Sequence, residues 1–86
     1  MELGRIRGTV VCTVCDPQLR GLRLVLVEPT DRDGFRLGTL LVAADAVGAR
    51  AGQLVCYETA REAPCAFPGE PPIDAAVIGI LDPVTT

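Results

Sequence analysis

The residues in this chain best suited to chemistry are its four cysteines. Cys12 and Cys15 have the CxxC spacing of a zinc site or a redox-active dithiol, and Cys56 and Cys65 could complete such a site. If one strand continues through Cys12 and Cys15, however, their side chains point to opposite faces. Cys56 and Cys65 are also too far apart in the sequence to form a zinc knuckle. We therefore predict small, ordinary cysteines and no bound metal.

The other side chains do not suggest an enzyme. The chain has no histidine, so it lacks the commonest general base and any Cys–His nucleophile pair. Gly48 and Gly52 superficially suggest a phosphate-binding loop, but no lysine, GxGxxG spacing or clear following helix supports one. Five carboxylates lie at turns and strand ends, and most of them are explained as solvated turn formers without a catalytic role: Asp31, Asp33, Asp45, Asp74 and Asp82. These features predict no catalytic residues, no cofactor and no enzymatic activity.

Charge and hydropathy also exclude several partners. The net charge is −3, and Tyr57, Phe35 and Phe67 are the only aromatic residues, so the chain lacks the basic stripe and stacking platform of a nucleic-acid binder. No apolar stretch is long enough to span a membrane, and the N-terminus lacks the apolar region of a signal peptide. We predict a cytosolic protein whose cysteines are reduced.

The share of apolar residues is high for a chain of this length. The 86 residues predict one small domain, 1–86, yet 49% of them are hydrophobic and only 3% are aromatic. The mean hydropathy is +0.36. A domain this small cannot bury so much apolar surface by itself, and a large exposed remainder usually marks an interface. We therefore expect an obligate oligomer.

The elements that position these residues are predicted to be short strands. Alternating or apolar patterns separated by turn signals predict five of them, at residues 4–14, 22–28, 40–45, 53–59 and 73–82. Gly8 predicts a bend in the first strand, and Gly34 suits a hairpin turn that needs a positive φ. At most one short helix is expected, capped by Thr59 with Glu62 in the capping-box position. The pattern indicates a small, closed or partly closed antiparallel barrel.

The last predicted strand, residues 73–82, is apolar on both faces. At a period of two, Ala76, Ile78 and Ile80 share one face, and the alternate residues from Ile73 share the other. A strand that is apolar on both faces needs cover on both sides. One face is expected to fill the barrel. The face of Ala76, Ile78 and Ile80 is expected to lie against further cover, including that of a neighbouring subunit.

Four segments in order resemble the EutN/CcmL family of vertex proteins from bacterial microcompartment shells. They are LGRIRGTVVCT at 3–13, DPQLRGLRLVLV at 16–27, VAADAVGA at 42–49 and PIDAAVIGILD at 72–82. The resemblance covers essentially the whole chain, and the last two segments are the most specific. It implies an all-β, OB-like barrel of five strands that assembles as a homopentamer. Such pentamers cap the vertices of a polyhedral shell that encloses metabolic enzymes in the bacterial cytoplasm, where hexameric and trimeric shell proteins form the facets.

The resemblance also suggests that one loop lies near the fivefold axis. This loop comprises Gly48, Ala49, Arg50, Ala51 and Gly52. The family usually has a small residue where this chain has Arg50, and an acidic residue near Gln53. Five copies of Arg50 would add a ring of positive charge at a central pore. Alternatively, Arg50 points to solvent or pairs with a neighbouring carboxylate.

Two other functions are compatible with a small barrel. The first is an OB-like binding module for an oligonucleotide or a small ligand, although the acidic charge and the few aromatic residues argue against it. The second is a metal or redox protein that uses the four cysteines. The excess of apolar residues, the two-faced strand and the missing catalytic groups favour a structural, self-assembling protein.

Overall fold

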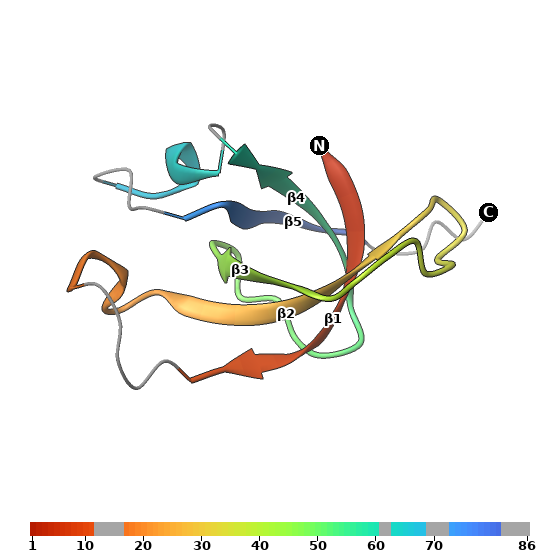
Figure 1. Cartoon of the computed structure of the whole chain (residues 1–86), viewed down its shortest axis with the longest axis horizontal. Coiled ribbons are helices and arrows are strands. Elements are labelled where there is room, and N and C mark those ends of the chain that lie inside the picture. Colours follow the sequence, from red (N-terminus) through yellow and green to blue (C-terminus); the bar gives the residue numbers. More distant parts are fainter. Residues whose placement is uncertain (12–16, 61–62, 69–72, 82–86) are drawn as a thin grey trace.

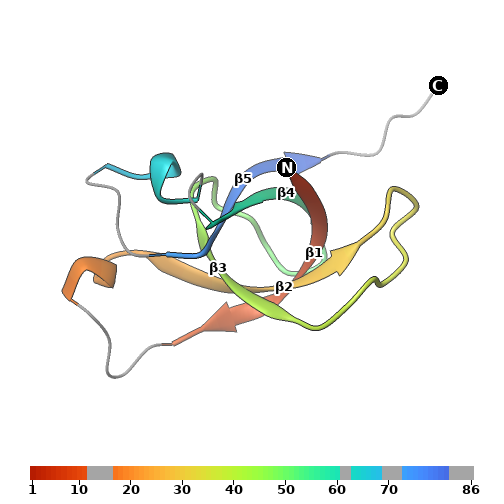
Figure 2. The same ribbon diagram turned by 45° about the horizontal axis from the view of Figure 1, so that its top comes forward.

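The chain forms a closed barrel of five strands in the order β1-β2-β3-β5-β4 (Figures 1 and 2). The computed structural model describes residues 1–11, 17–60, 63–68 and 73–81. The strands are β1 (Glu2–Val10), β2 (Arg23–Thr30), β3 (Leu41–Asp45), β4 (Leu54–Thr59) and β5 (Ala75–Leu81). The prediction of a small five-stranded barrel is confirmed, and each strand falls within a few residues of its expected range.

One of the five strand pairings is parallel. β1 pairs antiparallel with β2 and β4, β2 with β3, and β4 with β5. β3 and β5 pair in parallel, through Ala44 with Ala76 and Asp45 with Val77. This pairing corrects the expectation of a wholly antiparallel barrel. β4 does not pair with β3 but lies between β1 and β5 and is antiparallel to both. As a result, β5 runs in the same direction as β3, beside which it lies.

Helical structure in the described residues is limited to short turns. These include the 3-10 turns η1 (Pro17–Leu19) and η3 (Pro64–Ala66). The expected helix after Thr59 falls partly on residues 61–62, so Glu62 lies outside the described residues. Ala60 has a φ of +53°, and η3 begins at Pro64, where proline is tolerated in a first turn. In the part of the chain that the structure describes, no helix has the length and apolarity to cross a membrane.

Two irregularities change which side chains face the barrel interior. In β1 the register shifts between Ile6 and Gly8, which agrees with the bend predicted at Gly8. In β5, Val77 pairs with Tyr57 and Gly79 with Cys56, so Ile78 is an extra residue without a strand partner. An extra residue of this kind, a β-bulge, reverses the alternation beyond it. In β5 the sequence-based assignment of faces therefore fails beyond Ile78.

The barrel interior is filled mainly by aliphatic side chains. Its buried cluster comprises Ile6, Val25, Val27, Ala43, Ala49, Val55, Tyr57, Ala75 and Val77. Tyr57 is the only aromatic member, and its exposed fraction is 3%. Burial, with the nearby charge of Glu2 as a smaller cause, raises the pKa of Tyr57. Tyr57 therefore contributes to packing rather than to a surface for stacking.

Candidate functional site

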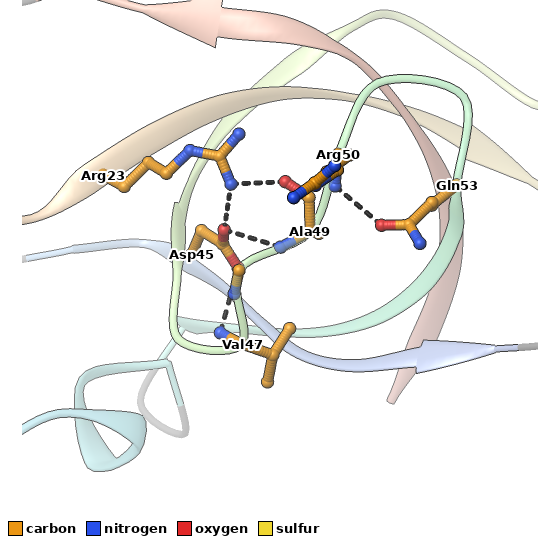
Figure 3. A network of polar contacts seen from close by, with 7 residues as sticks. Arg23, Asp45, Val47, Ala49, Arg50 and Gln53 are labelled. Carbon is orange, nitrogen blue, oxygen red and sulfur yellow. Dashed lines mark hydrogen bonds and ion pairs between the residues drawn. The ribbon is translucent and has the colours of Figure 1, made fainter.

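The carboxylate of Asp45 organises the loop between β3 and β4 (Figure 3). Its Oδ1 accepts hydrogen bonds from the backbone N–H groups of Val47 at 3.0 Å and Gly48 at 3.1 Å. Its Oδ2 accepts one from the N–H of Ala49 at 2.9 Å and lies 2.6 Å from Nη1 of Arg23. The same guanidinium nitrogen donates to the carbonyl oxygen of Ala49. These contacts tie the start of the loop to the end of β3 and to β2.

The second half of the loop is tied to β1. The N–H of Arg50 donates to the side-chain oxygen of Gln53 at 2.7 Å, and the N–H of Gln53 donates to the carbonyl of Arg50 at 3.1 Å. Gly52 donates to the carbonyl of Ile6 at 2.8 Å, and Ile6 donates to the carbonyl of Gln53 at 2.9 Å. The guanidinium of Arg5 donates to the carbonyl of Gly52 at 2.8 Å. The loop is therefore held by hydrogen bonds at both ends.

The five residues of the proposed axial loop differ in their exposure to solvent. Gly48, Arg50, Ala51 and Gly52 are exposed, whereas Ala49 is fully buried in the core cluster. Gly48 and Gly52 have φ values of +76° and +89°, a region that glycine adopts without strain. The two glycines thus allow the chain to turn on either side of Arg50. Ala49 anchors the loop in the barrel and cannot line a pore.

Asp45 forms a turn, as the sequence predicts, but its side chain is not solvated. The sequence predicts a solvated turn former, but the side chain is fully buried and accepts backbone hydrogen bonds at three successive positions. In the sequence, the turn is indicated by an aspartate followed within a few residues by a glycine, a pattern typical of an Asx turn. That pattern does not reveal burial, because burial depends on Arg23 from another strand.

The three residues expected on one outer face of β5 are also separated. Ala76 is fully buried in the single chain, and Ile80 packs against the core cluster. The reason is the bulge at Ile78, which places Ile80 opposite the buried Val55. Ile78 is partly exposed and is not among the residues that pack against the core. Of the three, Ile78 is the residue best placed to contact another molecule.

Glu28 forms a second buried ionic cluster at the other end of β2. Its exposed fraction is 4%, and its carboxylate oxygens each lie 2.8 Å from a guanidinium nitrogen, one of Arg7 and one of Arg36. The hydrogen bond from Arg7 is the largest cause that lowers the pKa of Glu28, and Arg36 adds to it, while burial opposes both. Glu28 thus joins β1 to the segment that follows β2.

We expect this cluster to make the stability of the fold depend on pH in the acidic range. The pKa of Glu28 is lowered by folding, so its contribution is complete above the ordinary glutamate value of about 4.3 and is lost as pH falls through the folded-state value. Glu28→Gln should lower the thermal midpoint at neutral pH and flatten its decline below about pH 4.3. Thermal unfolding across a pH series tests this. Parallel curves for the wild type and the variant would contradict it.

The described residues contain no group of three or more histidine, cysteine or acidic side chains that could hold a metal ion. Cys56 is buried and Cys65 is exposed. Cys12 and Cys15 lie outside the described residues.

The chain matches the sequence model of a family described as "Ethanolamine utilisation protein EutN/carboxysome" over residues 1–82. It is 40% identical to the carboxysome shell vertex protein CcmL of Nostoc sp., with 98% of this chain and 85% of that protein covered. It is 37% identical to the bacterial microcompartment shell vertex protein EutN of Escherichia coli, with 100% and 92% covered.

The solved structures of relatives have the same barrel. The pentameric microcompartment shell protein GrpN from Rhodospirillum rubrum is 36% identical and superposes with a TM-score of 0.88, over 100% of this chain and 99% of that one. CcmL of Nostoc sp. superposes with a TM-score of 0.87 at 40% identity, over 95% and 88%. From these matches in sequence and in fold, the chain belongs to the EutN/CcmL family of microcompartment shell vertex proteins.

Proposed function

We propose that this chain forms a homopentamer that caps the vertices of a polyhedral bacterial microcompartment shell in the bacterial cytoplasm. The whole chain, 1–86, acts as one structural domain and catalyses no reaction of its own. The observation that carries the proposal is the full-length superposition on the pentameric shell protein GrpN, with a TM-score of 0.88. The exposed apolar side chains give independent support, because a small soluble barrel with this surface needs a partner to cover it.

The partners in the shell are hexameric and trimeric facet proteins. A flat sheet of such units closes into a polyhedron only where fivefold units introduce curvature, and this is the role of the pentamer. Nucleic acid and membranes are not partners in this account. The alternative of an oligonucleotide-binding barrel has less support, because the net charge is −3 and Tyr57 is buried in the core.

The loop 48–52 lies near the fivefold axis in this proposal. Arg50 is exposed at its tip. The loop is held from both sides, because its backbone N–H groups donate to the side chains of Asp45 and Gln53 and one of its carbonyls accepts from Arg5. A ring of five such loops brings five guanidinium groups close together. Their repulsion is relieved where anions bind or where a carboxylate of a neighbouring copy pairs with Arg50.

Co-expression with a hexameric facet protein tests the proposed function. Closed polyhedral shells should form in the presence of this chain and show density at every vertex in electron micrographs. Without the chain, shells should have open vertices or remain as sheets and tubes. If shells close equally well without it, or if purified shells exclude it, the vertex role is wrong.

The outer side of β5 is a proposed contact between subunits, and Ile78 is its test residue. Ile78→Asp places a charge in a half-buried apolar contact and should weaken pentamer formation by roughly tenfold or more, while the monomer still folds. Sedimentation over a dilution series measures the association, and circular dichroism checks the fold. An Ile78→Asp variant that remains a pentamer at the same dilution as the wild type would remove Ile78 from the interface.

A further inference from the structure

The connection between β2 and β3 forms an arm, residues 31–40, that projects from one end of the barrel (Figures 1 and 2). The side chain of Asp31 fixes its tip, because Oδ1 accepts hydrogen bonds at 2.9 Å from the N–H groups of both Asp33 and Phe35. The carbonyl of Asp31 also accepts one from the N–H of Gly34 at 3.1 Å. Gly34 has a φ of +87°, as its place in the turn requires.

The base of the arm is equally constrained. Arg36 forms an isolated β-bridge with Thr30 and an ion pair with the buried Glu28 at 2.8 Å. The N–H of Leu37 donates to the carbonyl of Pro29 at 2.9 Å. The arm is therefore an ordered extension of the barrel. A surface that is already ordered loses little conformational entropy when it binds a partner.

The side chains that this ordered arm presents are apolar. Phe35 is 70% exposed, Leu37 is 66% exposed and Leu40 is 47% exposed, and Val42 follows in β3 at 49%. No charged residue occurs between Leu37 and Asp45, whereas Arg32 and Asp33 lie toward the tip. An uncharged apolar centre with charges at the rim is the usual composition of a protein–protein interface.

A groove of about 430 Å³ lies beside the base of the arm. Its lining is mostly apolar and comprises Glu2, Leu3, Pro29, Thr30, Leu37, Gly38, Leu41 and Tyr57. Leu37 belongs to both the arm and the groove, so the two form one continuous surface. Among the described residues of this chain, nothing covers Phe35 or Leu37.

We propose that the arm and this groove, the arm surface, contact the next copy of the same chain in the ring. This inference rests on the proposed pentamer. A cyclic ring is built from heterologous contacts, in which one patch meets a different patch on the neighbour. Each copy therefore uses its arm surface on one side and a separate receiving surface on the other. An arm that projects from one end of the barrel suits such a contact.

A second copy fits this surface better than a facet protein does. In a pentamer that has not yet joined a shell, an uncovered arm surface would leave three large apolar side chains, Phe35, Leu37 and Leu40, exposed on every subunit. Contiguous exposed patches of more than a few hundred Å² are uncommon on soluble proteins and promote aggregation. Burial within the ring removes them before any facet protein arrives.

The chain has no tryptophan, so Phe35→Trp introduces a single fluorescent probe in the arm. In the assembled ring its quenching by acrylamide should be several-fold weaker than after dissociation by dilution, and its emission should shift to the blue. Val11→Trp is the control. Val11 is 85% exposed and follows the end of β1, which lies at the other end of the barrel from the arm (Figure 1). If Phe35→Trp is quenched as strongly in the assembled ring as after dissociation, the proposal is overturned.

Substitutions in the arm surface test the same contact through their effect on the oligomeric state. Leu37→Asp should raise the concentration at which the ring dissociates by roughly tenfold or more, whereas Leu37→Met, which keeps the side chain apolar, should leave it nearly unchanged. Equal effects of the two variants, or a Leu37→Asp ring as stable as the wild type, would overturn the proposal. If Leu37→Asp pentamers stay intact but no longer enter shells, the arm binds a facet protein instead. A wild-type chain that is monomeric would refute the proposed function itself.

Discussion

Replacing Asp45 with alanine should lower the free energy of unfolding by about 3 kcal/mol. The carboxylate accepts hydrogen bonds from three backbone N–H groups, and its side chain is fully buried. Hydrogen bonds to a charged group contribute about 1.5–3 kcal/mol each, and the loop recovers part of this by exposing its N–H groups to water. Urea unfolding at a fixed protein concentration measures the change, because dissociation of a ring makes apparent stability depend on concentration.

Two further variants separate the causes of this effect. Arg23→Ala should cost only about 1 kcal/mol, because 41% of the Arg23 side chain is exposed to water and Asp45 keeps its three backbone hydrogen bonds. Asp33→Ala removes an exposed carboxylate from the arm and should change stability by less than about 0.5 kcal/mol. If Asp45→Ala is no worse than Asp33→Ala, the carboxylate does not organise the loop.

Gly4→Ala should destabilise the barrel by about 2–3 kcal/mol. Gly4 lies in β1 where it pairs with both β2 and β4, and a methyl group there would overlap Cγ1 of Val27. It would also lie 3.0 Å from the carbonyl oxygen of Glu28 and 3.1 Å from Cε1 of Tyr57. Val27 is fully buried, so it has little space to move aside.

Gly8→Ala is the matched control in the same strand. A Cβ built on Gly8 meets no atom within 4 Å, so the substitution should be neutral or stabilise the fold by up to about 0.5 kcal/mol through the unfolded state. Thermal and urea unfolding of both variants measure the difference. Equal stability of the two variants would show that the close approach at Gly4 does not exist.

The strand content and the barrel were predictable because local patterns encode them. Alternating or continuously apolar runs, bounded by turn residues, located all five strands, and Gly34 marked the turn in the arm. The turn could be predicted because positive φ is a local property of glycine. The parallel pairing of β3 with β5 could not be predicted, because it depends on β4 lying between β1 and β5 rather than beside β3.

The assignments that failed depend on contacts between distant residues. The bulge at Ile78 turns Ile80 inward and is visible only from the register with β4. Asp45 is buried because Arg23 and three backbone N–H groups surround it. The ion pair between Arg36 and the buried Glu28 is likewise not marked by any local pattern. A period of two in the sequence carries none of this information.

The most direct test of the pentamer is the solution mass of the purified chain. Native mass spectrometry, with light scattering at micromolar concentration as a second measurement, should give five times the chain mass of 9.0 kDa. A stable monomer, or a dimer that does not change with concentration, would contradict the pentamer and with it the vertex role.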